Sequence, residues 1–310
     1  MLAYQALLLP SGDLLLDRRL DWARGLIERG EAAAAARLLD ELVEQAPDFL
    51  VGWLLLGEAR ERMSAHPQAI TAFRRALALD PENRLGAALR LARLGDIPPG
   101  AAMSKAYLRT LFDQYAQRFD EELNALSYRG PALLMEAIDR VVGARTRFSR
   151  VADLGCGTGL MGAAIRPRTD EIVGADLSPA MIAKARAKKI YDRLVVGDLL
   201  DFLATERGPF DLVLAADVFV YFADLKPVLG AIARKLMPRG CLAFSLERHA
   251  AGDVALNESL RYAHGEAHVR TAAERAGLDV LHLARVSTRT EKRKPVDGWI
   301  VVLAPSQRET

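Results

Sequence analysis

The sequence predicts an all-helical N-terminal domain followed by an α/β domain with a mostly parallel sheet. Residues 17–96 carry apolar residues at helical spacing and almost no strand pattern. From Val151 onward, strand-like runs alternate with helix-like runs, which is typical of repeated βα units. The last two strand-like runs, 279–289 and 298–304, leave no room for a helix between them and must form a hairpin.

The composition indicates an ordinary globular protein. The chain has 310 residues, of which 51% are hydrophobic and 26% charged, and its formal net charge is +2. No basic block suggests a nucleic-acid partner. The two cysteines, Cys156 and Cys241, are too few for a zinc site, and they sit in a turn and a strand. We therefore expect no metal, no structural disulfide and a cytoplasmic location.

The N-terminal segment is apolar but lacks a basic stretch, and Pro10, Gly12 and Asp13 interrupt it. We expect neither a signal peptide nor a membrane-spanning helix there. The segment is interpreted as a helix that packs on the next one.

Residues 1–97 contain a repeat with a period of 34, in which Pro47 recurs as Pro81 and Ala35 as Ala69. Large residues on one helix and small residues where its partner crosses are the tetratricopeptide (TPR) pattern. The second copy fits this pattern at Trp53, Leu56, Gly57, Ala69, Phe73, Ala76 and Pro81. About two repeats and a capping helix are predicted. They form a groove for a partner, a self-association surface, or a cover for the second domain.

A connecting region is predicted at 98–150. Pro98, Pro99 and Gly100 cannot continue a helix and indicate a short stiff connector. An amphipathic helical stretch follows at 105–126 and carries aromatic residues. These are Tyr107, Phe112, Tyr115 and Phe119. They form either core packing against the sheet or an aromatic lid over a cofactor.

Seven strands and four intervening helices are predicted within 151–310. The strands are expected at 150–155, 171–178, 193–200, 210–217, 241–247, 279–289 and 298–304. The helices are expected from the glycine turn to Ile165, then at 179–189, 224–237 and 268–277. A turn is expected at Pro238–Gly240.

Two glycine patterns overlap in VADLGCGTGLMG, residues 151–162. Gly155, Gly157 and Gly159 form G-x-G-x-G, the turn of S-adenosylmethionine (SAM) methyltransferases. Gly157, Gly159 and Gly162 form G-x-G-x-x-G, the dinucleotide fingerprint. The choice between them separates methyl transfer from hydride transfer.

The position of the acids favours the methyltransferase pattern. The tight turn directly after the first strand belongs to Gly155, which the dinucleotide pattern does not use. Asp153 before it would repel a pyrophosphate but suits an ammonium group. Acids end the first four strands, and the carboxyl ends of parallel strands share one cleft. These acids are Asp153, Asp176, Asp198 and Asp217. Gly162 is then a small residue for close contact between helix and sheet.

Four stretches, in this order, resemble the motifs of class I SAM-dependent methyltransferases. They are VADLGCGTGL, VGADLSPAMIAKA, VVGDLLDFL and FDLVLAADVFVYFADL. Over residues 16–304 the chain is similar to bacterial TPR-containing predicted methyltransferases. The resemblance implies a Rossmann-like sheet of seven strands, the last antiparallel, with SAM as the cofactor and S-adenosylhomocysteine (SAH) as the product.

The resemblance also implies cofactor-binding residues. Gly155 and Gly157 let the backbone pass close to the methionine part, and Asp153 orients its ammonium group. Asp176 accepts the ribose hydroxyls. The remaining contacts come from Leu177, Met181, Asp198 and Leu199 near the adenine, Ala216 beside the methyl group, and Arg129 at the carboxylate. Each of these residues also has a plain packing or capping explanation.

The candidate catalytic residues follow the fourth and fifth strands or lie in the segment LRYAHGEAHVR. They are Asp217, Tyr221, His249, Tyr262 and His264. A general base is needed only if the acceptor must lose a proton. The segment 260–270 is expected to be a site loop.

The sequence leaves the acceptor atom open and favours a small-molecule acceptor over a protein. Two alternatives remain: an NAD(P)-dependent oxidoreductase, and a TPR adaptor with a SAM-sensing domain.

Overall fold

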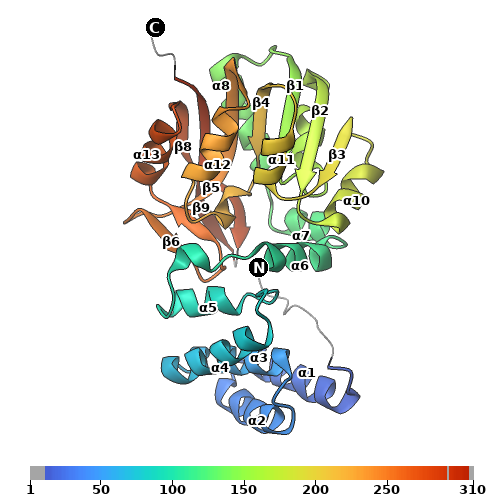
Figure 1. Ribbon diagram of the computed structural model, residues 1–310, viewed down its shortest axis with the longest axis vertical. Helices are drawn as coiled ribbons and strands as arrows, with labels where there is room; N and C mark the ends of the chain where they lie inside the picture. Colours follow the sequence, from blue (N-terminus) through green and yellow to red (C-terminus); the bar gives the residue numbers. More distant parts are fainter. Residues whose placement is uncertain (1–10, 292, 307–310) are drawn as a thin grey trace. The chain divides into compact units, whose positions relative to one another are not determined.

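The computed structural model describes residues 11–291 and 293–306, which form two units (Figure 1). The first is helical and ends at Leu111, and the second is α/β and begins at Phe112. Most of the N-terminal segment that was expected to form a packed helix, residues 1–10, lies outside the described residues. Within the described ranges, no helix is long and apolar enough to cross a membrane.

The helical unit is built from successive antiparallel helices. They are α1 (Leu14–Glu28), α2 (Ala32–Gln45), α3 (Leu50–Arg62), α4 (His66–Leu79) and α5 (Ala87–Arg93), followed by the 3-10 turn η1 (Pro99–Ala101). The side chain of Asp13 caps α1 by accepting the amide of Leu15 at 2.7 Å. Small residues sit where helices cross, because a Cβ on Gly57 would lie 2.5 Å from the ring of Phe73. The all-helical prediction is confirmed, and the TPR assignment stays a prediction.

The connecting region contains three helices. They are α6 (Lys105–Tyr115), α7 (Phe119–Ala125) and α8 (Gly130–Val142). The stretch predicted as one amphipathic helix is thus two helices with a break at 116–118.

The α/β unit contains a single sheet whose main path has the order β3-β2-β1-β4-β5 (Figure 1). Its strands are β1 (Phe148–Leu154), β2 (Thr169–Asp176), β3 (Arg193–Val196), β4 (Phe210–Ala215), β5 (Leu236–Arg248), β6 (Val254–Leu256), β7 (Tyr262–His264), β8 (Leu278–Glu291) and β9 (Lys294–Pro305). Strands β1 to β5 pair in parallel, and β9 pairs antiparallel with both β5 and β8. The predicted closing hairpin and antiparallel last strand are confirmed.

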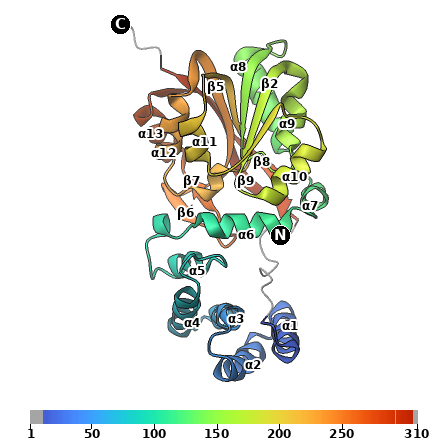
Figure 2. The ribbon, with the colours of Figure 1, turned by 45° about the vertical axis from the view of Figure 1, so that its right-hand side comes forward.

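Helices cover both faces of this sheet. They are α9 (Leu160–Ile165), α10 (Pro179–Ala187), α11 (Leu199–Thr205), α12 (Lys226–Ala233) and α13 (Glu266–Arg275), with 3-10 turns η2 (Arg166–Arg168) and η3 (Phe219–Tyr221). Val151 packs with α8 and α9, whereas its neighbour Ala152 packs with α11, α12 and α13. Successive strand residues point to opposite faces, so each face buries its own core. Figure 2 shows helices on both sides of the sheet.

Three details differ from the sequence prediction. The sheet has nine strands among the described residues, because β6 and β7 form an extra short hairpin beside the end of β5. The third strand ends at Val196, and the rest of its predicted length begins α11, because Asp198 caps that helix. Pro238–Gly240 lies inside β5, where the register against β4 shifts, so the expected turn is a strand irregularity.

Candidate functional site

The glycine turn after β1 places three glycines in the left-handed region, with φ of +62° at Gly155, +53° at Gly157 and +92° at Gly159. A Cβ on Gly155 would lie 2.4 Å from Val218, so packing alone requires glycine there. A Cβ on Gly157 would meet nothing closer than the ring of Phe119, at 3.7 Å. The open side of the turn is therefore at Gly157.

Asp176, at the end of β2, is tied to this turn. One carboxylate oxygen accepts the amide of Gly157 at 2.9 Å, and the other accepts the amide of Ser178 at 2.8 Å. The residue is 8% exposed, and burial raises its pKa to about 6. Two backbone donors fix the orientation of a carboxylate that retains further acceptor capacity.

Asp153, at the end of β1, is 1% exposed and accepts a hydrogen bond from the hydroxyl of Tyr191 at 2.6 Å. Burial raises its pKa to about 7. Tyr191 also explains Gly162, because a Cβ there would lie 2.3 Å from the tyrosine hydroxyl. Gly162, the third glycine of the dinucleotide pattern, thus makes room for the side chain of Tyr191. Its close contact is with this loop residue, whereas a close contact between helix and sheet was predicted.

The other residues predicted to bind cofactor follow β2, β3 and β4. Asp198 accepts the amides of Leu200 at 3.0 Å and Asp201 at 3.3 Å, which caps α11. The glycine before it, Gly197, has open space where a Cβ would stand. Leu199 is buried in the core, and Leu177 and Ala216 are partly buried.

Aromatic residues of α6 and α7 lie over the open side of the glycine turn. Phe119 contacts Phe112 and Tyr115 edge-on, with ring centroids 6.4 and 5.5 Å apart. Tyr115 also packs with the buried Met181. Phe112 in turn contacts Tyr221 at 5.6 Å. The cluster is packed core and also covers Gly157.

Two aspartates fasten these helices to the turn region, and sequence reasoning missed both. Asp113 accepts the hydroxyl of Ser178 at 2.5 Å and the amide of Ala180 at 3.2 Å. Asp120 accepts the hydroxyl of Thr158 at 2.5 Å and pairs with Lys188 at 2.7 Å. The signal in the sequence was an aspartate directly after each phenylalanine in LFDQYAQRFD.

Asp217 follows β4 at a φ of +56°. Its amide donates to the hydroxyl of Ser245 at 2.7 Å, and this hydroxyl donates back to its carboxylate at 2.6 Å. The other carboxylate oxygen lies 3.5 Å from the guanidinium of Arg289. Asp217 is therefore held by side chains of β5 and β8.

A buried charge network extends from Asp217. Arg289 donates to Glu247 at 2.5 Å and to Glu291 at 2.8 Å, and its side chain is 1% exposed. Arg261 lies 3.4 Å from Glu247. Burial alone would raise the pKa of Glu247, but Arg261 and Arg289 outweigh it and hold that pKa below its usual value.

Two further catalytic candidates, Tyr221 and His249, follow β4 and β5. Tyr221 lies between the ring of Phe112 and the guanidinium of Arg261, whose carbon is 5.9 Å from the ring centroid. His249 is partly buried just beyond β5, where its amide donates to the carbonyl of His264 at 3.0 Å.

The expected site loop at 260–270 is wrong, because Tyr262 and His264 lie on β7 and α13 begins at Glu266. Both side chains are fully buried. Burial raises the pKa of Tyr262 to about 12. Burial and His268 lower the pKa of His264 to about 4, and its Nε2 donates to the carbonyl of Phe222 at 2.9 Å. His264 is therefore a neutral imidazole.

Arg129 lies directly before α8 with its side chain 63% exposed. Its nearest carboxylate is Glu136, at 3.8 Å, so the structure gives it a surface ion pair.

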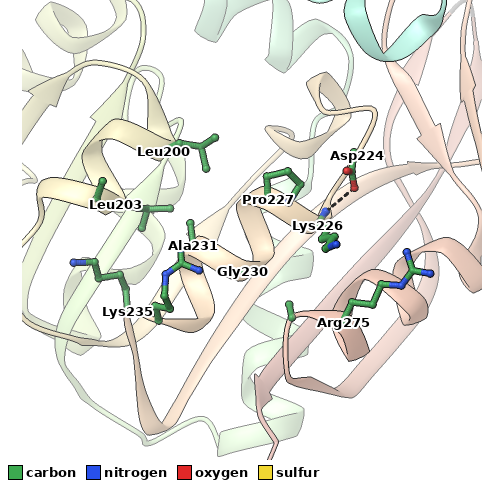
Figure 3. Close-up of a pocket in the computed structure, with 12 residues that line it drawn as sticks. Leu200, Leu203, Asp224, Lys226, Pro227, Gly230, Ala231, Lys235 and Arg275 are labelled. Atoms are coloured by element: carbon green, nitrogen blue, oxygen red, sulfur yellow. Dashed lines mark hydrogen bonds between the residues drawn. The ribbon is translucent and has the colours of Figure 1, made fainter.

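A cavity of about 970 Å³ lies beside α11, α12 and α13 (Figure 3). Leu203 and Ala231 line its apolar part, and Lys226, Lys235 and Arg275 stand around it. None of the predicted site residues lines this cavity. The predicted site is instead at the carboxyl ends of β1, β2, β4 and β5.

Residues 152–242 match the model of a family described as a methyltransferase domain. Human methyltransferase-like protein 27 is 32% identical over 105 residues, which cover 33% of this chain and 43% of that protein. The demethylmenaquinone methyltransferase of Thermus thermophilus is 35% identical over 140 residues, which cover 43% of this chain and 62% of that enzyme. The chain thus spans about half the length of these curated relatives.

Among solved structures, the magnesium protoporphyrin IX methyltransferase of Synechocystis with bound SAH has a TM-score of 0.52 and 17% identity. The likeness covers 66% of this chain and 100% of that one and concerns the fold. Residues 152–242 are therefore similar to a methyltransferase domain, and the sheet that contains them shares the fold of the Synechocystis enzyme.

Proposed function

We propose that this protein is a SAM-dependent methyltransferase that acts on a small polar acceptor. The observation that carries the proposal is the hydrogen bond from the Gly157 amide to the Asp176 carboxylate. It joins the open side of the glycine turn to the acid at the end of the neighbouring parallel strand. Ligands of such sheets bind at this strand edge.

The residues at this edge fit SAM. Gly197 has open space where a Cβ would stand, whereas a Cβ on Gly157 would be in van der Waals contact with the ring of Phe119, at 3.7 Å. Asp176 would accept the ribose hydroxyls, Asp153 would face the ammonium group, and Asp198 with Leu199 would lie near the adenine. When bound, SAM supplies a methyl group on a sulfonium, which is its own leaving group. The protein then has to align the acceptor and exclude water.

The acceptor side is polar, which favours a polar acceptor. Asp217 is 22% exposed and fixed by Ser245 and Arg289, so it can orient a hydroxyl or amine. Tyr221 and Phe112 supply aromatic surface beside it. The names of the Thermus and Synechocystis enzymes refer to small-molecule acceptors, which supports the same size class here.

Calorimetry with SAH and with NAD tests the cofactor. The proposal requires SAH binding; binding of NAD alone would favour an oxidoreductase. Incubating the protein and methyl-labelled SAM with a cell lysate then tests the acceptor, with labelled metabolites separated from labelled proteins. If the methyl label appears in the protein fraction instead, the acceptor is a protein and the proposed small-molecule acceptor is wrong.

The buried thiols of Cys156 and Cys241 suit a reducing cytoplasm, which we propose as the location of the protein. The helical unit is proposed to be TPR-like and to contact a partner protein or a second copy of this chain. Its α1 exposes apolar side chains, with Leu14 at 78%, Leu15 at 70% and Trp22 at 66%. Light scattering over a range of protein concentrations tests self-association. If a Trp22→Glu variant associates as the parent protein does, the exposed apolar residues of α1 are not the contact surface.

A further inference from the structure

Tyr191 reaches the centre of the cofactor side from outside the motifs. It lies in the loop between α10 and β3, and its hydroxyl donates to Asp153 at 2.6 Å. Burial and the nearby Asp153 raise the pKa of this hydroxyl, so it remains a proton donor. None of the sequence motifs includes it.

The ring of Tyr191 lies in a slot formed by three glycines, Gly159, Gly162 and Gly174, where a larger residue would clash with it. A Cβ would lie 3.1 Å from the ring at Gly159, 2.3 Å from the hydroxyl at Gly162 and 2.8 Å from the ring at Gly174. Gly174 is the cross-strand partner of Asp153 in β2. A glycine inside a strand weakens it and marks a close approach. Here the group that approaches is Tyr191, which crosses β2 to reach the carboxylate on β1.

Asp153 has little other support for a negative charge. Burial raises its pKa most and repulsion by Asp176 raises it further, whereas the Tyr191 hydroxyl and the Gly162 amide lower it. Cys156 and Tyr128 also face this carboxyl, and neither is a cation. A buried carboxylate without a cation needs hydrogen bonds to remain charged.

We propose that Tyr191 is a positioning residue that holds Asp153 ionised and oriented for the ammonium group of SAM. This inference rests on the proposed function. Tyr191 recognises the amino-acid part of the cofactor through Asp153 and makes no difference to the nucleoside part. Its role is therefore separable from that of Asp176.

The test compares two ligands that differ in the amino-acid part. SAH carries the ammonium group, and 5′-methylthioadenosine lacks it. In the Tyr191→Phe variant the ring still fills the glycine slot, but the hydroxyl is gone. Loss of this donor raises the pKa of Asp153 from about 7 by about one unit. The ionised fraction at pH 7 then falls about fivefold.

Calorimetry between pH 6 and 8 should therefore show SAH binding about fivefold weaker in Tyr191→Phe at pH 7. The pH midpoint of SAH affinity should move upward, and 5′-methylthioadenosine affinity should stay within about twofold. In an Asp153→Asn background, Tyr191→Phe should change SAH affinity no further. Thermal unfolding of each variant confirms that it is folded.

Equal weakening of both ligands, or an unmoved pH midpoint, would show that Tyr191 only packs and would overturn the inference. A parent protein that binds neither ligand would overturn the proposed function first, and the inference with it. The two failures are thus distinguished by the parent protein alone.

Discussion

The carboxyl ends of the strands form two regions, the proposed cofactor side at β1 and β2 and the proposed acceptor side at β4 and β5. The pKa values of buried carboxyl groups shift in opposite directions in these two regions. On the cofactor side, burial raises the pKa of Asp153 to about 7 and that of Asp176 to about 6. On the acceptor side, Glu247 is as deeply buried, yet Arg261 and Arg289 hold its pKa below the usual value. On the proposed acceptor side Glu247 is paired with arginines, whereas among the described residues no cation pairs with Asp153 or Asp176 on the proposed cofactor side. Under the proposed function, the ammonium group of SAM would supply a positive charge beside these two acids.

The largest effect on stability is expected from removing the guanidinium of Arg289, which lies between Asp217 and Glu247. Arg289→Met leaves Glu247 and Asp217 without their shared guanidinium, and breaking a buried pair costs about 3–5 kcal/mol. The unfolding free energy from urea denaturation should fall by this amount.

Arg285 is the matched control for Arg289. It lies on the same strand, pairs with Asp297 at 2.8 Å and is 65% exposed. Arg285→Met should cost less than about 1 kcal/mol. Equal losses in the two variants would mean that the network around Arg289 is not a buried structural unit.

The next effect concerns the cofactor side. Asp176→Ala removes the acceptor of the Gly157 amide and the carboxylate proposed for the ribose. SAH affinity measured by calorimetry should fall about 100-fold, since a hydrogen bond to a charged group is worth about 1.5–3 kcal/mol.

Asp170 supplies the control at the opposite end of the same strand, where it pairs with Arg147 and is 63% exposed. Asp170→Ala should leave SAH affinity within about twofold. If Asp176→Ala binds SAH as the parent does, the ribose role of this acid is wrong.

A smaller effect should separate packing from ligand contact among the glycines. Gly155→Ala places a Cβ 2.4 Å from Val218 at a φ of +62° and should lower the unfolding free energy by about 2 kcal/mol. Gly197→Ala has open space around its Cβ and should change stability by less than about 0.5 kcal/mol. Differential scanning calorimetry without ligand compares them, and a stable Gly155→Ala would refute the packing argument.

The smallest effect is a proton release. Because the folded pKa values of Asp153 and Asp176 lie above the usual values, these groups destabilise the ligand-free fold as the pH rises from about 4 to about 7. Binding SAH should reverse this by favouring the ionised forms. About one proton per SAH should be released at pH 6.5, measured by calorimetry in buffers of different ionisation enthalpy.

The control for the proton release is Asp153→Asn, which should reduce it to about a quarter of a proton. Proton uptake by the parent protein would instead show that the acids bind the cofactor in their neutral forms.

The same contrast decides what the sequence could predict. The cofactor side is local: Gly155 and Gly157 follow one strand, and Asp176 ends the next. Parallel topology brings such strand ends together, so their order along the chain predicts their proximity. The alternation of strand and helix patterns predicted the sheet, and the short gap between 279–289 and 298–304 predicted its closing hairpin.

The acceptor side depends on pairs that no local pattern reveals. Arg289 meets Asp217 across 72 residues, and its strand reads as an ordinary edge hairpin. The segment around Tyr262 was misread as a loop because its three-residue strand is too short for alternation to show. Tyr191 was missed because a single aromatic residue in a loop carries no period, although Gly162 and Gly174 marked its slot.

The length of β5 has a consequence for how such an enzyme can diversify. β5 pairs with β4 as far as Phe244 and continues to Arg248, where β7 becomes its neighbour. Ser245 and Glu247 therefore lie on an extension of β5 that no longer pairs with β4. Under the proposed function, exchanges in the β6–β7 hairpin would change the acceptor side and leave unchanged the ends of β1 and β2, which are proposed to hold SAM.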